Sequence, residues 1–316
     1  MTAQIEHREV RPTGYGEIYQ IPYQSDMSAD DIRRLFPNTN AVIAVDFPIS
    51  GEGEPLLTPE GDLIGHQFKN GVISVDHHND DLQMCQPNIC TTTLAWQMVE
   101  AGMRPNKKTP IVINHHDPDS ILSAVLLSGM EGGLVKRDKL VEAALCSDHG
   151  VKPSSEKLNK IIELLFALDE RDSFADSWVA VESLLRGYRM PDYVDPALRA
   201  YRAIKKRAEE AFQRVEEMGR GVHLLYLNEG IPSHHFIEAA RRGGAKVLVI
   251  ISPDPYDEKN LRIRVRGVDL PEFVYLTAMD LGRFGFRGRF DAGSIFANDG
   301  IDPDLVMKTI VEHMPT

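Results

Sequence analysis

Histidine and aspartate side chains cluster at residues 114–119, where the sequence reads Asn-His-His-Asp-Pro-Asp. His115, Asp117 and Asp119 could bind a metal ion, because two carboxylates spaced Asp-x-Asp beside imidazoles suit a hard cation such as Mn²⁺ or Mg²⁺. The alternative is that an aspartate only caps the following helix while the histidines face solvent. This cluster alone does not decide between the two interpretations.

Three further clusters of acidic and histidine residues favour the metal site. Asp46 follows an apolar segment, and Asp76-His77-His78 follows another. Adjacent histidines at a strand end have no packing rationale, because a buried histidine pair is costly without partners. Asp148, in Ser147-Asp148-His149-Gly150, is the fourth carboxylate after an apolar segment. Asp46 and Asp148, each taken alone, could equally be turn residues.

The elements that must position these residues are short strands followed by helices. Apolar, β-branched runs at 40–46, 71–75 and 109–113 predict buried strands, and 51–70 predicts a loop that could hold a hairpin. Thr91, Thr92 and Thr93 are predicted to cap a helix through Ala101, and another helix begins near Ile121. Ligands of open α/β sheets bind beyond the carboxyl ends of the strands, where the clusters fall.

The pattern of elements predicts an α/β protein in three parts. Residues 1–165 are predicted to form a domain with a mostly parallel sheet, and 166–220 a helical connector whose last helix spans 196–218. Residues 221–316 are predicted to form a smaller α/β domain. Its predicted strands are 222–227, 245–251 and 261–266, and its helices 233–242, 271–281 and 303–313.

Arginines are concentrated in the predicted C-terminal domain. Arg262, Arg264 and Arg266 alternate on one face of a strand, which either protects a sheet edge or binds an anion. Residues 282–293 are rich in Gly and Arg, a composition that can expose backbone N–H groups and guanidinium groups to phosphate. We prefer this interpretation of the loop to a bare linker.

Composition limits the classes of function. The net charge of -12, from 35 basic and 47 acidic residues, disfavours non-specific binding to duplex nucleic acid. No apolar run approaches the ~18 residues that a membrane span needs, and the N-terminus has no signal-peptide pattern. The three cysteines, without Cys-x-x-Cys spacing, fit reduced thiols in a cytoplasmic protein.

Taken together, the motifs resemble the DHH phosphoesterase family, which includes RecJ-type nucleases, nanoRNases, cyclic-dinucleotide phosphodiesterases and manganese-dependent pyrophosphatases. Residues 222–296 more loosely resemble the DHH-associated substrate domain. The residues that carry the resemblance are Asp76-His77-His78, the helix Thr91–Glu100, His115-x-Asp117-x-Asp119 with Ser123-Ala124, Asp46, Ser147-Asp148-His149-Gly150, Pro232-Ser233-His234-His235, Arg266 and Gly288-Arg289-x-x-Ala292-Gly293.

The chain departs from the family pattern in three places. The His-x-Asp-x-Asp motif follows the Asp-His-His motif, whereas in the family it comes first, which implies a circular permutation or a rewired sheet. Ser120 replaces the usual Gly, and Arg289 stands where the associated domain usually has His. The last departure bears on the class of substrate.

The resemblance implies a site with two Mn²⁺ ions, with Mg²⁺ or Co²⁺ as alternatives, that hydrolyses a small phosphodiester, a short oligonucleotide or a dinucleotide. His115, Asp117 and Asp46 would bind one ion, and Asp119, Asp46, His77 and Asp148 the other. His78 would face the substrate phosphate, and Asp76 would orient an imidazole. The substrate-binding residues implied are Arg266, Arg287, Gly288 and Arg289.

Two other classes of protein compete with this enzyme. The chain could be a catalytically inactive nucleotide-binding or scaffold protein of the same fold, or a mononuclear Zn²⁺ hydrolase built on the two histidine pairs. Metal content discriminates between them, since a scaffold need not hold two Mn²⁺ ions. The expected partner is a small phosphorylated substrate, with neither duplex nucleic acid nor a membrane, and a homodimer remains open.

Overall fold

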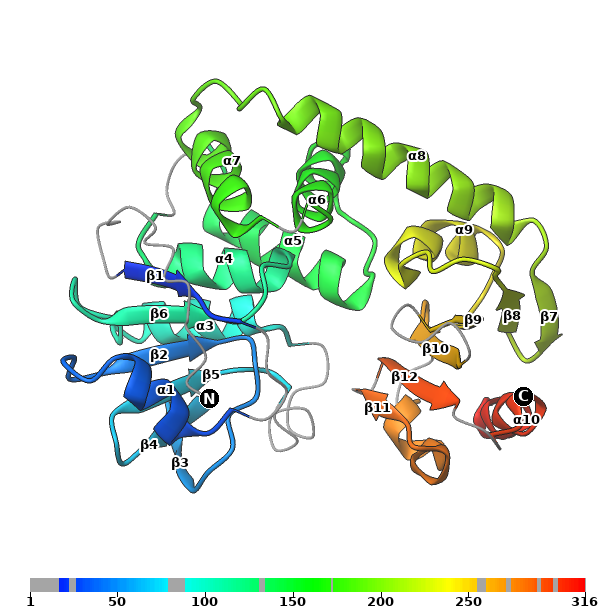
Figure 1. Cartoon of the computed structure of the whole chain (residues 1–316), viewed down its shortest axis with the longest axis horizontal. Helices are drawn as coiled ribbons and strands as arrows, with labels where there is room; N and C mark the ends of the chain where they lie inside the picture. Colours follow the sequence, from blue (N-terminus) through cyan, green and yellow to red (C-terminus); the bar gives the residue numbers. More distant parts are fainter. Residues whose placement is uncertain are drawn as a thin grey trace. The chain divides into compact units, whose positions relative to one another are not determined.

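The computed structural model describes residues 17–22, 27–78, 89–130, 134–171, 173–254, 260–270, 274–288, 291–297 and 301–315. The chain divides into two compact units (Figure 1). The first contains Met1–Asp148 and Lys152–Arg199, and the second contains His149–Val151 and Ala200–Thr316.

The first unit is built on a six-stranded sheet with the order β1-β6-β2-β5-β4-β3. The neighbours β1, β6, β2 and β5 are parallel, whereas β4 and β3 form an antiparallel hairpin at the edge. The predicted mostly parallel α/β sheet is therefore confirmed. The strands are β1 (Glu17–Gln20), β2 (Val42–Val45), β3 (Gly53–Leu57), β4 (Leu63–Phe68), β5 (Val72–Val75) and β6 (Pro110–Ile113).

Helices cover both faces of this sheet because successive strand residues point to opposite sides. Val42, Ala44 and Val112 pack with α1 on one face, and Ile43 and Val45 pack with α3 and α4 on the other. The helices of this unit are α1 (Ala29–Leu35), α3 (Thr91–Glu100), α4 (Pro118–Leu127), α5 (Arg137–His149), α6 (Glu156–Asp169) and α7 (Phe174–Arg186).

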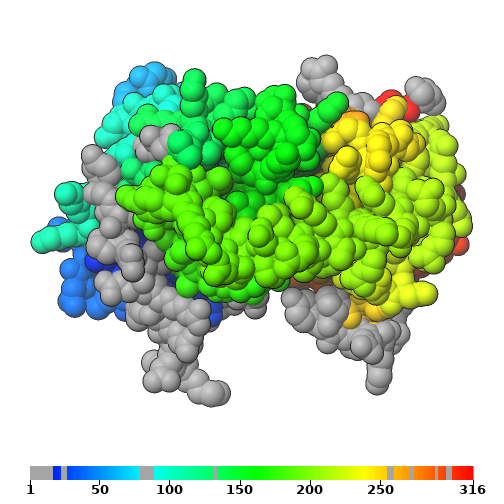
Figure 2. Space-filling view, turned by 90° about the horizontal axis from the view of Figure 1, so that it is seen from above, coloured from blue at the N-terminus to red at the C-terminus, as the bar shows by residue number. Residues whose placement is uncertain are grey.

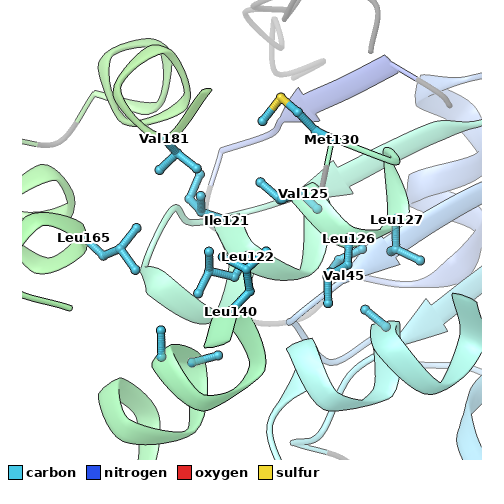
Figure 3. Packing of buried hydrophobic residues seen from close by; sticks show 14 of the residues in the cluster. Val45, Ile121, Leu122, Val125, Leu126, Leu127, Met130, Leu140, Leu165 and Val181 are labelled. Atoms are coloured by element: carbon cyan, nitrogen blue, oxygen red, sulfur yellow. The ribbon is translucent and has the colours of Figure 1, made fainter. Parts of the chain in front are cut away.

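Helix α4 lies at the centre of the first unit, and every one of its residues is buried. Its apolar side chains meet the sheet on one side and three further helices on the other (Figure 3). The packed residues labelled there include Ile121, Leu122, Val125 and Leu126 of α4 with Val45 (β2), Leu140 (α5), Leu165 (α6) and Val181 (α7). A helix that is buried all round is held rigidly, and α4 begins beside Asp117 and Asp119.

The second unit has a six-stranded sheet with the order β11-β12-β10-β9-β8-β7. One face packs on α10 and the 3₁₀ turns η2 and η3, and the other packs on η1, α9 and the C-terminal part of α8. The elements are α8 (Val194–Phe212), β7 (Glu216–Gly219), β8 (Val222–Tyr226), η1 (Ser233–Phe236), α9 (Ile237–Arg242), β9 (Val247–Pro253), β10 (Leu261–Gly267), η2 (Leu276–Ala278), η3 (Leu281–Phe284), β11 (Arg287–Gly288), β12 (Ala292–Ala297) and α10 (Pro303–His313).

The predicted division at 165 and 220 differs from the observed compact units. The end of α6 and all of α7, predicted to begin the connector, pack in the core of the first unit through Leu168 and Trp178. Helix α8 contributes residues to both units, and its yellow-green surface is open to solvent in the space-filling view (Figure 2).

Four local predictions were wrong. Helix α8 ends at Phe212 instead of Met218, because Glu216–Gly219 pairs with β8 across a Gly-Arg-Gly turn in which all three residues have positive φ. The predicted helix 271–281 is replaced, within its described residues, by a 3₁₀ turn that ends before the left-handed Asp280.

Asp148 lies in the last turn of α5 and not after the helix. Cys90, not a threonine, occupies the N-cap of α3.

No helix among the described residues is long and apolar enough to cross a membrane.

Truncating the α4 core should destabilise the first unit. We expect Leu126→Ala to lower the free energy of unfolding by about 2–5 kcal/mol, because it leaves a cavity where the side chain is fully buried. Urea unfolding followed by tryptophan fluorescence measures this unit specifically, since Trp96 and Trp178, the two tryptophans of the chain, both lie in it. Leu57→Ala, at a half-exposed position of β3, is the matched control and should change stability by less than about 1 kcal/mol. Equal effects of the two substitutions would contradict the central role of α4.

Candidate metal centre

The carboxyl ends of three neighbouring parallel strands carry the acidic and histidine residues. In the order β6-β2-β5 (Figure 1), Asp46 follows the central strand β2, Asn114-His115 follow β6, and Asp76-His77 follow β5. The register pairs Val45 with Val75 and Ala44 with Val112, so the three strands end at nearly the same level. Asp46 is thereby placed between the two histidine clusters.

Asp46 is 1% exposed and has a positive φ of 63°. Aspartate is one of the few residues other than glycine that tolerate this left-handed conformation, and such residues gather at functional sites. Both carboxylate oxygens accept hydroxyl hydrogen bonds, Oδ1 from Thr91 at 2.8 Å and Oδ2 from Ser120 at 2.6 Å. The carboxylate is therefore held in one orientation from both sides.

One group of potential ligands consists of Asp46, His115 and Asp117, whose ligand atoms lie within 4.8 Å of one another. His115 Nε2 is 3.2 Å from Asp46 Oδ2 and 3.4 Å from Asp117 Oδ2. Asp117 is also the N-cap of α4, accepting a hydrogen bond from the Ser120 N–H through its Oδ1. Asp117 does cap the helix, but His115 contacts carboxylates instead of only facing solvent, because Asp117 Oδ2 is directed at its ring.

A second group consists of His77, Asp119 and Asp148, with the same 4.8 Å limit. His77 Nε2 is 3.1 Å from Asp148 Oδ2, and His77 Nδ1 is 3.5 Å from Asp119 Oδ2 and 3.4 Å from Asp46 Oδ1. Asp119 accepts hydrogen bonds from the backbone N–H groups of Thr91 and Thr92, both at 2.8 Å. Asp119, which belongs to α4, thus accepts hydrogen bonds from the first N–H groups of the neighbouring helix α3.

The ionisable groups of the site lie close enough to shift one another's pKa values. Burial, together with the charges of Asp46 and Asp148, raises the pKa of Asp119 to about 7. Burial also opposes ionisation of Asp46, but hydrogen bonds from His115 and His77 outweigh it and hold the pKa of Asp46 well below its usual range. Burial would lower the pKa of His77 and His115, yet the neighbouring carboxylates raise both pKa values well above normal. The site therefore holds excess negative charge that favours cations.

Asp76 and His78 form a pair beside these two groups. His78 Nδ1 is 2.7 Å from Asp76 Oδ1, which also accepts the backbone N–H of His78. Asp76 is 3% exposed, whereas the His78 side chain is 37% exposed. Although burial and the charge of His77 oppose protonation, Asp76 raises the pKa of His78. Asp76 holds the ring of His78 in one orientation.

The predicted substrate-binding residues belong to the second unit. Arg266 is on β10, and Arg287 and Gly288 form β11, whereas Arg289 lies outside the described residues. Arg264 and Arg287 both lie opposite Ser294 of β12, so the two arginines share a face of this sheet. Burial and the charge of Arg262 lower the pKa of Arg264 to about 10, and its guanidinium group donates hydrogen bonds to the Ile231 carbonyl at 2.7 Å and to the Ser252 hydroxyl at 2.8 Å.

Gly288 has a packing reason for being glycine. It lies directly opposite Gly293, and a Cβ on Gly288 would come within 2.3 Å of the Gly293 Cα and of the Ala292 carbonyl oxygen. The residue is therefore required for the approach of β11 to β12, whether or not it also binds substrate.

Thr91, Thr92 and Ser120 contact the predicted ligands but were not among the predicted site residues. Their hydroxyl groups hydrogen-bond Asp46 and Asp119, and all three residues are fully buried. The sequence signal was the run of threonines after the Asp-His-His segment, which we interpreted only as a helix cap. Ser120, in place of the usual glycine of the related motif, uses its hydroxyl group to orient Asp46.

The residues present fit two divalent cations. The first group contains the three ligands that the resemblance implies for one ion. The second contains three of the four implied for the other ion, and the fourth, Asp46, lies 3.4 Å from His77. Each group combines carboxylate oxygens with one imidazole nitrogen, a donor set suited to Mn²⁺. The carboxylates raise the pKa values of His77 and His115 against the effect of burial, which indicates negative surroundings that a cation would complement. That ions bind here remains a prediction.

The fold was compared with solved structures. PggH, the pGpG-specific phosphodiesterase from Vibrio cholerae, matches with a TM-score of 0.47 and 16% identity over 69% of this chain and 87% of that chain. An exopolyphosphatase-related protein from Bacteroides fragilis matches with a TM-score of 0.40 and 10% identity over 90% and 74% of the two chains. RecJ from Thermus thermophilus, in complex with Mn²⁺, has a TM-score of 0.41 and 13% identity over 90% and 43%.

No family model and no curated protein matches the sequence.

The metal-free protein should lose stability as the pH rises. Asp119, His77 and His115 have folded-state pKa values above their unfolded values. The stability that each contributes is present below the unfolded pKa, which is 3.8 for Asp119, and is lost as the pH passes the folded value of about 7 for this group. For the histidines the loss begins above a pH of about 6.5.

We expect the Tm in the presence of a chelator to be lower at pH 9 than at pH 6, by roughly 5 °C. Asp119→Asn should reduce this difference because the variant lacks one of the titrating groups. Thermal unfolding followed by tryptophan fluorescence measures both, and a Tm that stays constant or rises between these pH values would contradict the electrostatic description.

Proposed function

We propose that this chain is a metal-dependent phosphoesterase of the DHH type that hydrolyses a small phosphodiester, a short oligonucleotide or a dinucleotide. The observation that carries the proposal is the position of Asp46, whose two oxygens face the two ligand groups, Oδ2 toward His115 and Oδ1 toward His77. A carboxylate shared in this way suits a pair of ions and has no evident structural purpose.

The proposed ligands divide between the two groups. His115, Asp117 and Asp46 would hold one ion, and Asp46, His77, Asp119 and Asp148 would hold the other. Mn²⁺ is proposed, with Mg²⁺ and Co²⁺ as substitutes, because hard carboxylate oxygens dominate both sets. A pair of bound ions lowers the pKa of a shared water and neutralises charge on the phosphoryl group.

His78 is proposed as the residue that acts on the substrate directly. Its side chain is 37% exposed, more than those of Asp46, Asp76 and His77 beside it, and Asp76 raises its pKa against the opposing effects of burial and the charge of His77. A protonated imidazole fixed by a buried carboxylate can stabilise phosphate charge or donate a proton to the leaving oxygen. Asp76 would act on the reaction only through this orientation.

The arginine face of the second unit is proposed to bind the substrate away from the scissile bond. Arg266 and Arg287, with the backbone of Gly288, would supply guanidinium and N–H donors for phosphate, and Arg289 is proposed to join them from the sequence alone. The net charge of -12 argues against long polyanions and favours a short substrate. A monomeric or homodimeric enzyme in the cytoplasm would be compatible with these features.

Metal content and turnover test the proposal together. We expect about two Mn²⁺ per chain and Mn²⁺-dependent hydrolysis of bis-p-nitrophenyl phosphate, both measured on the purified protein. Asp46→Asn keeps the shape and tolerates the left-handed backbone, and it should lower kcat by at least about 10²-fold and reduce the metal content. Asp62→Asn, at an exposed carboxylate, is the control and should retain the wild-type kcat and metal content.

Other outcomes would identify the competing classes. Protein that holds no Mn²⁺ and gives no turnover with excess metal would be a binding or scaffold protein of this fold. A single tightly held Zn²⁺ would indicate a mononuclear hydrolase. Asp46→Asn protein with wild-type activity would remove the two-metal site, because Asp46 would then be only a turn residue.

Replacement of His78 should separate chemistry from metal binding. We expect His78→Gln to lower kcat by about 10²–10⁴-fold, since it removes a positioned proton donor, while two Mn²⁺ ions still bind. Steady-state kinetics and elemental analysis of the same preparation measure the two effects. His313→Gln, on the exposed end of α10, is the control. Loss of metal in His78→Gln would assign His78 to metal binding instead.

A further inference from the structure

The start of α3 contains a fully buried hydroxyl group that does not cap the helix. Thr91 is 0% exposed, and the N-cap position belongs to Cys90, which makes no side-chain capping hydrogen bond. The N–H groups of Thr91 and Thr92 are satisfied by Asp119 instead. The Thr91 side chain is therefore not needed to begin the helix, and its position requires another reason.

Thr91 contacts three of the proposed metal ligands. Its Oγ1 lies 2.8 Å from Asp46 Oδ1 and 2.8 Å from His77 Nδ1, and its backbone N–H donates to Asp119 Oδ2 at 2.8 Å. The backbone N–H of His77 also donates to Oγ1, at 3.3 Å.

The directions of these hydrogen bonds are fixed by the number of protons available. A threonine hydroxyl donates once and accepts twice, whereas a carboxylate only accepts. The hydroxyl proton of Thr91 therefore goes to Asp46 Oδ1, and its oxygen accepts from the backbone N–H and from the Nδ1–H of His77. A neutral His77 then carries its proton on Nδ1 and its lone pair on Nε2, the atom 3.1 Å from Asp148 Oδ2.

The same contact keeps the His77 ring away from the carboxylates. Asp46 Oδ1 and Asp119 Oδ2 are 3.4 Å and 3.5 Å from Nδ1, longer than the 2.8 Å to the hydroxyl group. Without the hydroxyl, those two oxygens would be close acceptors for the Nδ1–H among the residues that the structure describes. They would then be drawn into hydrogen bonds with the ring and would be poorer ligands.

We propose that Thr91 is a positioning residue that sets the tautomer of His77, so that Nε2 is its metal-binding atom, and that directs Asp46 Oδ1 through the same hydroxyl. The inference rests on the proposed two-metal function and names a residue on which metal affinity depends. Partners that orient a metal-binding histidine typically change metal affinity by about 10–100-fold when they are removed.

The test compares Thr91→Val, which removes the hydroxyl at nearly constant shape, with Thr91→Ser, which retains it. Mn²⁺ titration followed by electron paramagnetic resonance of unbound Mn²⁺ should show one of the two binding steps weakened about 10–100-fold in Thr91→Val. Thr91→Ser should stay within about threefold of the wild type, since the hydroxyl is kept. Thr93→Val is the matched control, because the Thr93 hydroxyl is 3.3 Å from Cys90 Sγ and contacts no proposed ligand.

Tryptophan fluorescence in chelator shows whether each variant is folded, and Thr91→Ala replaces Thr91→Val if the valine variant is unfolded. Equal Mn²⁺ affinity of the valine (or alanine) variant and the wild type would overturn the inference while the proposed function stands. Weak binding by Thr91→Ser would also overturn it, since the hydroxyl would not be the cause. Wild-type protein that binds no Mn²⁺ would overturn the proposed function, and with it this role of Thr91.

Discussion

The buried carboxylate of Asp46 is the constraint on which the rest of the site depends. A charge removed from water is costly unless hydrogen bonds and opposite charge compensate it. Here the compensation comes from four different places in the sequence, namely hydroxyl groups of Thr91 and Ser120 and the imidazoles of His77 and His115. All of them can reach one carboxylate only because β2 lies between β6 and β5.

The two helices that follow these strands make a concentration of carboxylates tolerable. The N-terminus of α3 donates two backbone N–H groups to Asp119, and the N-terminus of α4 donates one to Asp117. Helix N-termini carry partial positive charge, so each stabilises the carboxylate it faces. Burial, with the charges of Asp46 and Asp148, nevertheless raises the pKa of Asp119 to about 7, so the backbone donors do not fully offset these effects.

The sequence was most informative about structure that depends on one strand alone, such as the position of a buried strand and of the residue that follows it. Apolar runs that end in Asp46, Asp76 or Asn114 located three buried strands, and with them the residues that converge. The sequence was less informative where a neighbouring strand decides the secondary structure. Glu216–Gly219, for example, is a strand only because β8 lies beside it. The roles of Thr91 and Ser120 could not be predicted, because a hydroxyl at a helix start looks like a cap until the neighbouring strand ends are known.

The chain order of the motifs matters less than the order of the strands. In the sheet, the strand that precedes His115 lies beside the strand that ends at Asp46, although 64 residues separate the end of β2 from the start of β6, 46–109. Parallel neighbours require a crossover connection but place no condition on which strand is made first. A site built from strand ends is therefore preserved when its motifs are reordered along the chain, provided that the central strand still supplies the shared carboxylate. Asp46 meets that condition, so the reversed order of the His-x-Asp-x-Asp and Asp-His-His motifs is compatible with one metal centre.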